Sequence, residues 1–160
     1  MKAWDTFAQI TGTAAAALIG LLFVAVSIRI VSIARSQELR NRAAQTLSLF
    51  GTVLITSVLI AIPGQAYRTL GAEVVVLAVI TGVGLDLLDR RAKSDRSNQA
   101  IAPVLEAVAP NTVTSLLLLA AGIVLVLGVQ AGLYVLVGPV LVALVFGIVS
   151  TWLFLTKITE

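Results

Sequence analysis

Five long apolar runs constrain what this chain can fold into. They cover about residues 7–33, 43–62, 70–88, 111–129 and 133–155. Each is close to the roughly 20 residues that a helix needs to cross about 30 Å of hydrocarbon. Because the apolar zone of a bilayer offers backbone groups no water, and an open sheet would leave its edges unpaired, these spans have to be helical. The sequence therefore predicts an all-α, polytopic transmembrane helix bundle of about five spans, with residues 1–160 forming a single transmembrane domain.

The composition indicates that lipid covers much of the surface. Hydrophobic residues make up 59% of the chain and charged residues 12%, whereas a soluble domain typically has about 45–50% apolar and about 25% charged residues. A soluble domain of this size would need many more polar groups to cover its surface. The sequence has no cysteine and no histidine. This excludes disulfides, cysteine or histidine metal sites, and catalysis built on either residue.

Turn-forming residues separate the later runs. Pro63-Gly64 closes the second run, and Gln130-Ala131-Gly132 separates the fourth from the fifth. One helix over residues 111–155 would be more than twice the membrane thickness at about 1.5 Å per residue, so we expect a tight hairpin there. The segment at about 102–109 has apolar residues at helical spacing. It predicts either a short interfacial helix or an ordinary apolar linker beneath the bundle.

The basic residues are divided unevenly between the two sides of the membrane. The 29–42 and 89–110 regions carry four each and the C-terminal tail carries Lys157, whereas the other side holds only Lys2 and Arg68. Since basic residues concentrate in cytoplasmic loops, we expect the N-terminus outside and the C-terminus in the cytoplasm. The amphipathic aromatic residues fit this orientation, with Trp4, Tyr67 and Tyr134 at the outer interface and Trp152 at the inner one.

The cytoplasmic basic residues predict a collar that faces anionic lipid head groups. Each such residue near the membrane surface is worth about 1 kcal/mol of attraction. The collar consists of Arg35, Arg40, Arg42, Arg90, Arg91, Lys93 and Arg96. Nucleic acid is not an expected partner, because these residues lie beside apolar runs and no stacking aromatic residues lie among them.

Small residues recur four apart on the first span, at Gly12, Ala16 and Gly20. Such spacing lets two helix backbones approach closely. We expect these residues to form the closest helix–helix contact of the molecule. The partner helix can belong to the same chain or to another copy, and both alternatives stay open.

Polar residues follow one face of each of the first two spans. They are Gln9, Thr13 and Ser27 on span one, and Thr52 and Thr56 on span two. Two such stripes can line a narrow aqueous path. They can equally be side chains that bond to their own helix backbone or bridge neighbouring helices.

Four ionisable residues lie near the ends of spans: Glu73, Arg68, Asp86 and Arg29. Charge in a membrane is costly and usually faces protein or water. We expect Glu73 to face protein or water with Arg68 or a hydroxyl group as its partner, although all four can simply be interfacial ions. Acidic and basic groups do not converge on one site, so we expect no enzyme activity, no cofactor and no metal site.

Several packing motifs in the first half of the chain resemble a known group of proteins. They are Thr11-Gly12-Thr13-Ala14 through Val26-Ser27, Pro63-Gly64-Gln65 and Leu70-Gly71-Ala72-Glu73. With these motifs the chain resembles small uncharacterised bacterial multi-pass membrane proteins. The resemblance implies a place in the bacterial cytoplasmic (inner) membrane and carries no activity with it.

Short loops, the small-residue face of span one and the lack of a catalytic set favour one class of function. We interpret the chain as a membrane protein that acts as a homo-oligomer or as a subunit of a larger membrane assembly. The alternative is a small channel or transporter whose path is lined by the polar stripes of spans one and two. The partners expected are the lipid bilayer and either another copy of the chain or another membrane protein.

Overall fold

The chain folds into an all-helical bundle, which confirms the expected fold class. The computed structural model describes residues 2–28, 30, 33, 37–94 and 110–156. The five helices described are α1 (Lys2–Ile28), α3 (Gln37–Ala61), α4 (Tyr67–Ser94), α5 (Pro110–Val126) and α6 (Gly132–Thr156). The predicted segment 102–109 lies outside the described residues.

Helix length and composition are those of a multi-pass membrane protein. In α1, α3, α4 and α6 the apolar stretches are 25, 23, 18 and 21 residues long, enough to cross a membrane. α5 has 17 residues and at about 1.5 Å per residue is about 25 Å long, slightly less than the hydrocarbon thickness. Both α3 and α4 continue beyond the predicted apolar runs, because their polar ends still contain good helix formers such as glutamate, arginine and lysine.

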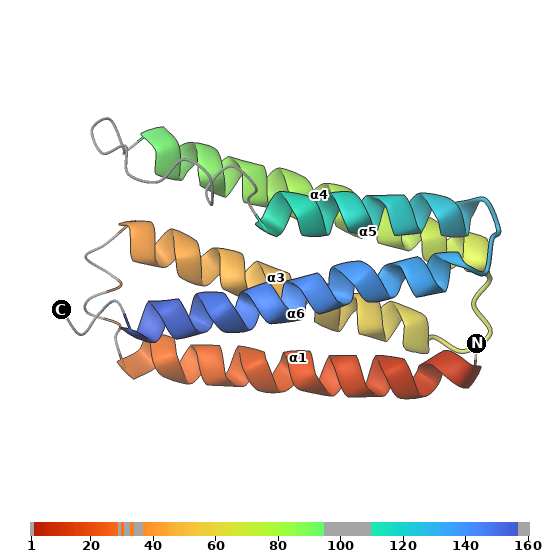
Figure 1. Cartoon of the computed structure of the whole chain (residues 1–160), viewed down its shortest axis with the longest axis horizontal. Helices are drawn as coiled ribbons and strands as arrows, with labels where there is room; N and C mark the ends of the chain where they lie inside the picture. Colours follow the sequence, from red (N-terminus) through yellow and green to blue (C-terminus); the bar gives the residue numbers. More distant parts are fainter. Residues whose placement is uncertain (1, 29, 31–32, 34–36, 95–109, 157–160) are drawn as a thin grey trace.

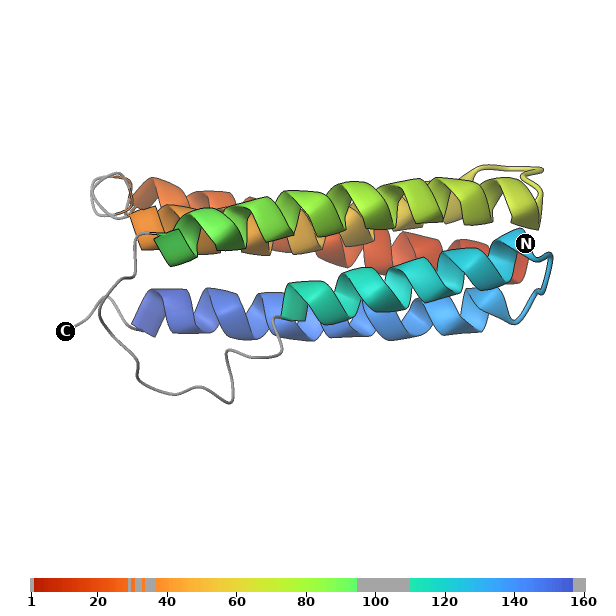
Figure 2. The same cartoon turned by 90° about the horizontal axis from the view of Figure 1, so that it is seen from above.

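Consecutive helices run in opposite directions (Figures 1 and 2). The N-terminus and the two short connections, residues 62–66 and 127–131, lie at one end of the bundle, and the last turn of α6 lies at the other. We call these the N-terminal end and the opposite end. Because five helices alternate in direction, the start of the first helix and the end of the last lie at opposite ends of the bundle.

Both short connections contain a glycine in the left-handed region. Gly64 has φ 72° and Gly128 has φ 80°, a conformation that costs glycine little because it has no Cβ. At the end of α5 the Gly128 N–H donates to the Leu125 carbonyl (2.8 Å) and the Val129 N–H to the Val124 carbonyl (3.3 Å), the pattern of a Schellman C-cap. The predicted hairpin between the last two spans is therefore confirmed.

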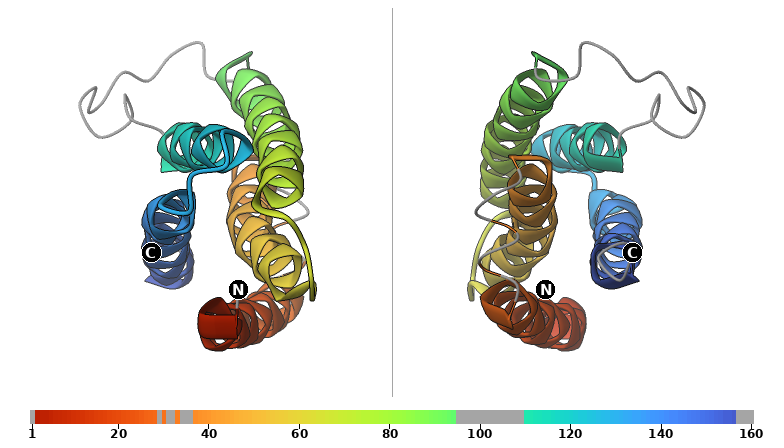
Figure 3. Two further views of the ribbon diagram at one scale, coloured as in Figure 1. Left: turned by 90° about the vertical axis from the view of Figure 1, so that its right-hand side faces the viewer. Right: turned by 90° about the vertical axis from the view of Figure 1, so that its left-hand side faces the viewer.

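Four of the helices close into a ring, and the fifth packs on its outside. α3 contacts α4, α4 contacts α5, α5 contacts α6, and α6 contacts α3. α1 lies against α3, with a smaller contact to α6, and Figure 3 shows it at the edge of the bundle. Only 17% of its apolar stretch is buried, against 44% for α3, so α1 is the most exposed of the four long helices.

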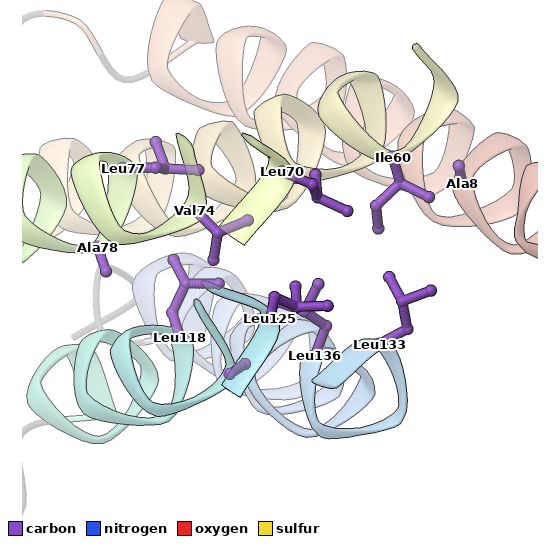
Figure 4. Packing of buried hydrophobic residues seen from close by; sticks show 11 residues of the cluster. Ala8, Ile60, Leu70, Val74, Leu77, Ala78, Leu118, Leu125, Leu133 and Leu136 are labelled. Atoms are coloured by element: carbon purple, nitrogen blue, oxygen red, sulfur yellow. The ribbon is translucent and has the colours of Figure 1, made fainter. Parts of the chain in front are cut away.

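Leucine side chains fill the ring toward the N-terminal end. Figure 4 shows those of α4 facing those of α5 and α6 across the interior. The cluster consists of Ala8, Ile60, Leu70, Val74, Leu77, Ala78, Leu118, Ala121, Leu125, Leu133 and Leu136. The outer surface is also apolar, with side chains such as Ile80 and Val145 more than half exposed. A bilayer would cover this surface.

Three aromatic residues predicted at one interface gather at the N-terminal end. Trp4 packs edge-to-face against Tyr134, with ring centroids 5.0 Å apart, and against Phe7 at 5.5 Å. Tyr67 packs against the same core cluster. Trp152 lies near the last turn of α6, toward the opposite end.

Candidate functional site

A narrow, mainly apolar cleft that includes three threonines lies inside the ring between α3, α5 and α6. Its polar lining consists of Thr52 and Thr56 from α3 and Thr114 from α5, and Pro139 of α6 closes the opposite wall. All three threonines are buried. The polar stripe predicted on span two therefore faces the interior of the ring.

The threonines of α3 are satisfied by their own helix. Thr52 Oγ1 donates to the Ser48 carbonyl and Thr56 Oγ1 to the Thr52 carbonyl, both at 2.8 Å. These bonds use the hydroxyl protons, so the hydroxyl oxygens present only lone pairs to the cleft. The cleft has no room for a water molecule, so the structure shows it closed.

Pro139 was not singled out from the sequence, although it interrupts the apolar run of the last span. It lies inside α6 and is fully buried. Proline has no N–H, so the carbonyl of Val135 loses its usual helical donor. The proline itself could be read from the sequence. Whether it faces lipid or the interior of the ring depends on how α6 packs, and this could not be read from the sequence.

The polar stripe of span one does not face the cleft. Gln9, Thr13 and Ser27 are all exposed on the outside of α1, and Ser27 Oγ donates to the Phe23 carbonyl at 2.8 Å. The bundle therefore does not bring together the two stripes predicted to form a path. Any path through this fold would be built from the ring helices alone.

The small residues of α1 are also divided between two surfaces. A Cβ on Gly12 would lie 3.2 Å from Ser57 Cβ of α3, whereas a Cβ on Gly20 would meet nothing within 4 Å. Ala16 is exposed as well. Within one chain, the prediction that these three residues form the closest helix–helix contact is wrong. Gly12 lies against α3, whereas Ala16 and Gly20 are exposed on the outer side of α1.

Hydroxyl groups connect helices at two places. Thr11 Oγ1 lies 2.8 Å from Ser57 Oγ across α1 and α3, and Thr46 Oγ1 lies 2.9 Å from Ser150 Oγ across α3 and α6. Hydrogen bonds between hydroxyl groups of neighbouring helices were one of the two interpretations of the polar stripes. The structure shows such bonds, but between residues that were not predicted to form them.

Glu73 has a protein partner, as expected, but the partner is Gln65. The Gln65 Nε2 group donates to Glu73 Oε2, and no ion pair joins Arg68 and Glu73 in the described part of the chain. Arg68 is exposed and extends over the α5–α6 turn, where its Nε lies 3.6 Å from the position of a Cβ on Gly128. Gln65 was missed because it lies in the turn between two spans.

The remaining predicted ionisable sites fall largely outside what the structure describes. Asp86 belongs to α4, but its side chain is not among those described, and Arg29 lies outside the described residues. Among the described side chains, no three carboxylate, histidine or cysteine groups come together at a distance suited to a metal ion.

No protein-family model, curated protein or solved structure matches the chain.

Proposed function

We propose that the chain acts as a homo-oligomer in a membrane and that the outer face of α1 is the contact between copies. The observation that carries the proposal is a continuous exposed stripe along α1. It consists of Thr6, Gln9, Thr13, Ala16, Gly20, Phe23 and Ser27, all exposed. We call it the outer α1 stripe.

The spacing of the outer α1 stripe suits a second helix. Its members alternate three and four residues apart, which is the spacing of the seam between two helices that cross at a shallow angle. Thr6, Thr13, Gly20 and Ser27 are small or short side chains and let a second backbone approach closely. The side of α1 that faces α3 has a separate row, which includes Ala8, Thr11, Ala15 and Leu22. The two rows lie on opposite sides of the helix.

Exposure to lipid is unfavourable for two polar side chains of the outer α1 stripe. Within the described ranges, the side chains of Gln9 and Thr13 have no hydrogen-bond partner, and both are exposed. A polar group without a partner in an apolar medium costs free energy. A second α1 placed against this stripe would offer amide and hydroxyl partners to both side chains, and would also exchange lipid contacts for close packing.

Cysteine cross-linking tests the proposal directly, because the natural chain has no cysteine. Single variants Thr13→Cys and Gly20→Cys place a thiol on the outer α1 stripe, where a Cβ at position 20 meets nothing. The matched control is Val145→Cys on α6, which is 57% exposed and lies away from the stripe. In membranes under mild oxidation we expect disulfide-linked dimers from the two α1 variants and far fewer from the control.

Other outcomes of this experiment contradict the proposal. Equal cross-linking of all three variants would mean that copies of the chain collide at random in the membrane and do not associate through the outer α1 stripe. Heterogeneous cross-links from the α1 variants, with no dimer of the chain, would mean that another membrane protein occupies the stripe. The chain would then be a subunit of a larger assembly.

We further propose that the bundle lies in a bacterial inner membrane with the opposite end in the cytoplasm. The division of basic residues supports this orientation, and Arg40 and Arg42 lie near the start of α3, at that end. Anionic lipid head groups are the partners proposed for these arginines. The test is whether the detergent-purified protein retains anionic lipid and loses it when Arg40 and Arg42 are both changed to Gln.

A channel or transporter activity is the second candidate, and the cleft beside Pro139 favours it. α6 is continuous through Pro139, but the proline leaves the Val135 carbonyl without its helical donor, and three threonines lie in the lining of the cleft beside it. A path through the cleft would have to open, since no water fits in the cleft as it stands. Cation flux into proteoliposomes, reduced by Thr56→Val, would support this candidate. Flux equal to that of empty liposomes would remove it.

A further inference from the structure

The buried apolar residues of the bundle form two clusters that meet at Pro139. The first is the leucine cluster toward the N-terminal end, to which α6 contributes Leu133 and Leu136. The second joins α1, α3 and α6, and consists of Ala15, Leu49, Val53, Val140 and Ala143. Pro139 lies between the two sets of α6 residues and borders the cleft. We call residues 132–138 the first part of α6 and residues 140–156 its second part.

The glycine contacts of the two parts of α6 are with different helices. In the first part, a Cβ on Gly132 would lie 2.7 Å from Leu125 Cγ and 3.0 Å from the Leu125 backbone nitrogen of α5. In the second part, a Cβ on Gly147 would overlap the Phe50 ring of α3, and the hydroxyl bridge between α3 and α6 adds a further contact. Movement of α5 relative to α3 would therefore bend α6 between its two parts.

The Gly138-Pro139 step is the least constrained part of the α6 backbone. Pro139 has no N–H, so the hydrogen bond to the Val135 carbonyl is lost. A glycine before proline has no Cβ to clash with the ring, so it reaches backbone angles that other residues in this place do not. A Cβ on Gly138 would meet no other helix of the described chain within 4 Å. Sharp bends in helices occur mostly at prolines, and this step is suited to one.

A polar stripe of α3 leads from the cleft toward the opposite end of the bundle. Its members are four, three, four and four residues apart and share one side of the helix. They are Asn41, Gln45, Ser48, Thr52 and Thr56. Thr52 and Thr56 line the cleft, and none of the five side chains is exposed. We call these five residues the inner α3 stripe.

The two ends of the cleft are closed to different degrees. Toward the N-terminal end, leucine side chains fill the ring (Figure 4). Toward the opposite end, α5 is short: it has 17 residues, against 25 in α3 and in α6. Figures 1 and 2 show that α5 starts inside the bundle, well short of the last turn of α6. Within the described ranges, the ring at the opposite end therefore consists of α3, α4 and α6.

We propose that α6 bends at Gly138-Pro139 and thereby opens the cleft to water from the opposite end. The leucine cluster takes residues from all five helices, so it is the fixed point about which they separate. α4 and α5 move with the first part of α6, because the backbone of each of these two helices lies against a glycine of the other. α1, α3 and the second part of α6 form the other group.

The opening exposes groups that water can bind. The inner α3 stripe offers hydroxyl and amide groups as far as Thr56, whereas the leucine cluster stays packed and closes the N-terminal side. Bending and hydration do not require that a solute crosses the membrane. They also do not involve the outer α1 stripe.

The reactivity of single cysteines tests the proposal in proteoliposomes. Thr52→Cys places a thiol in the cleft, Val74→Cys places one in the leucine cluster, and Val145→Cys places one on the outer surface. The probe is a small, charged methanethiosulfonate present on both sides of the membrane. We expect Thr52→Cys to react faster than both controls by about tenfold or more, because the reactive thiolate forms only where water reaches the sulfur. A Thr52→Cys rate equal to that of Val74→Cys would overturn the proposal.

Pro139→Ala tests whether the bend controls this access. Alanine restores the N–H that bonds to the Val135 carbonyl, so the reaction of Thr52→Cys should slow toward the rate of Val74→Cys. Val140→Ala is the matched control, because it also removes atoms from the cleft lining but leaves the backbone bonds of α6 unchanged. It should not slow the reaction. A rate that Pro139→Ala leaves unchanged or raises would contradict the bend.

Distances between spin labels give a second measurement that does not depend on reactivity. Labels at Val83 of α4 and Val145 of α6 join the two moving groups, whereas labels at Ile55 of α3 and Val145 lie within one group, and all three residues are exposed. With labelled chains diluted by unlabelled ones, we expect a broad distance distribution for the first pair, narrowed by Pro139→Ala, and a narrow one for the second. Equal widths that Pro139→Ala does not change would overturn the proposal. Cross-linking through the outer α1 stripe should be unaffected by Pro139→Ala, so a failure here is separable from a failure of the oligomer.

Discussion

Gly71 of α4 and Gly122 of α5 lie together at a very close helix crossing, where each lies against the backbone of the other helix. A Cβ on Gly122 would lie 3.2 Å from the Gly71 carbonyl oxygen, and a Cβ on Gly71 would lie 2.5 Å from the Val126 backbone nitrogen. Since both obstacles are backbone atoms, they cannot move aside as the end of a flexible side chain would. The two glycines allow α4 and α5 to pack at a distance that no larger residue permits.

We predict that Gly71→Ala destabilises the bundle by about 1–3 kcal/mol, the typical cost of overpacking. The control is Gly84→Ala in the same helix, where the added Cβ meets nothing. Alanine is favoured over glycine inside a helix by about 0.5–1 kcal/mol, so the control should be neutral or slightly stabilising. Thermal unfolding and size-exclusion profiles in one detergent measure both. Equal stability of the two variants would mean that the crossing is wider than described.

The hydroxyl pair between Thr11 and Ser57 is predicted to contribute little to stability. Thr11 Oγ1 also lies 2.8 Å from the Phe7 carbonyl oxygen and 3.4 Å from the Ala8 carbonyl oxygen, and Ser57 Oγ lies 2.9 Å from the Val53 carbonyl oxygen. Two hydroxyl protons are therefore shared among four possible bonds. A double-mutant cycle with Thr11→Val and Ser57→Ala should give a coupling energy near the average of about 0.6 kcal/mol for such bonds in membranes. A coupling well above about 1.7 kcal/mol, the upper end for such bonds, would show that this pair holds α1 in place.

Gly20→Leu is predicted to weaken the oligomer and to leave the single bundle intact. The added side chain would project from the outer α1 stripe and meet nothing within its own chain. Leu21→Val is the control, because Leu21 is 63% exposed and lies beside the stripe. Oligomeric fraction and Tm are measured together in detergent. A lower Tm of the monomer, or an unchanged oligomer, would count against the stripe as the contact.

The orientation in the membrane is predicted from the basic residues. A reporter fused after Glu160 should be cytoplasmic, and a tag before Lys2 should be outside. A third reporter inserted after Gln130, in the hairpin between α5 and α6, should also be outside, because this hairpin shares the N-terminal end of the bundle. Termini found on the same side would refute five spans.

The sequence alone determined the helices and the turns. The thickness of hydrocarbon sets the length of an apolar run, so the five runs could be recognised without knowledge of their packing. The stop at Pro63-Gly64 and the hairpin before Gly132 were also readable, because proline and glycine limit or permit particular backbone angles wherever they occur.

Only the tertiary structure decided which faces of the helices meet. Gly12 and Gly20 belong to the same row of small residues four apart, and both lie within the first apolar run of the sequence. In the structure, however, Gly12 packs on Ser57, whereas Gly20 lies on the outer surface. Glu73 likewise obtains its partner from the turn preceding α4 and not from Arg68. A helix in lipid is apolar on every side, so the pattern of hydrophobic residues does not reveal its rotation. The rotation is fixed by which small residues of neighbouring helices, such as Gly71 and Gly122, can approach one another.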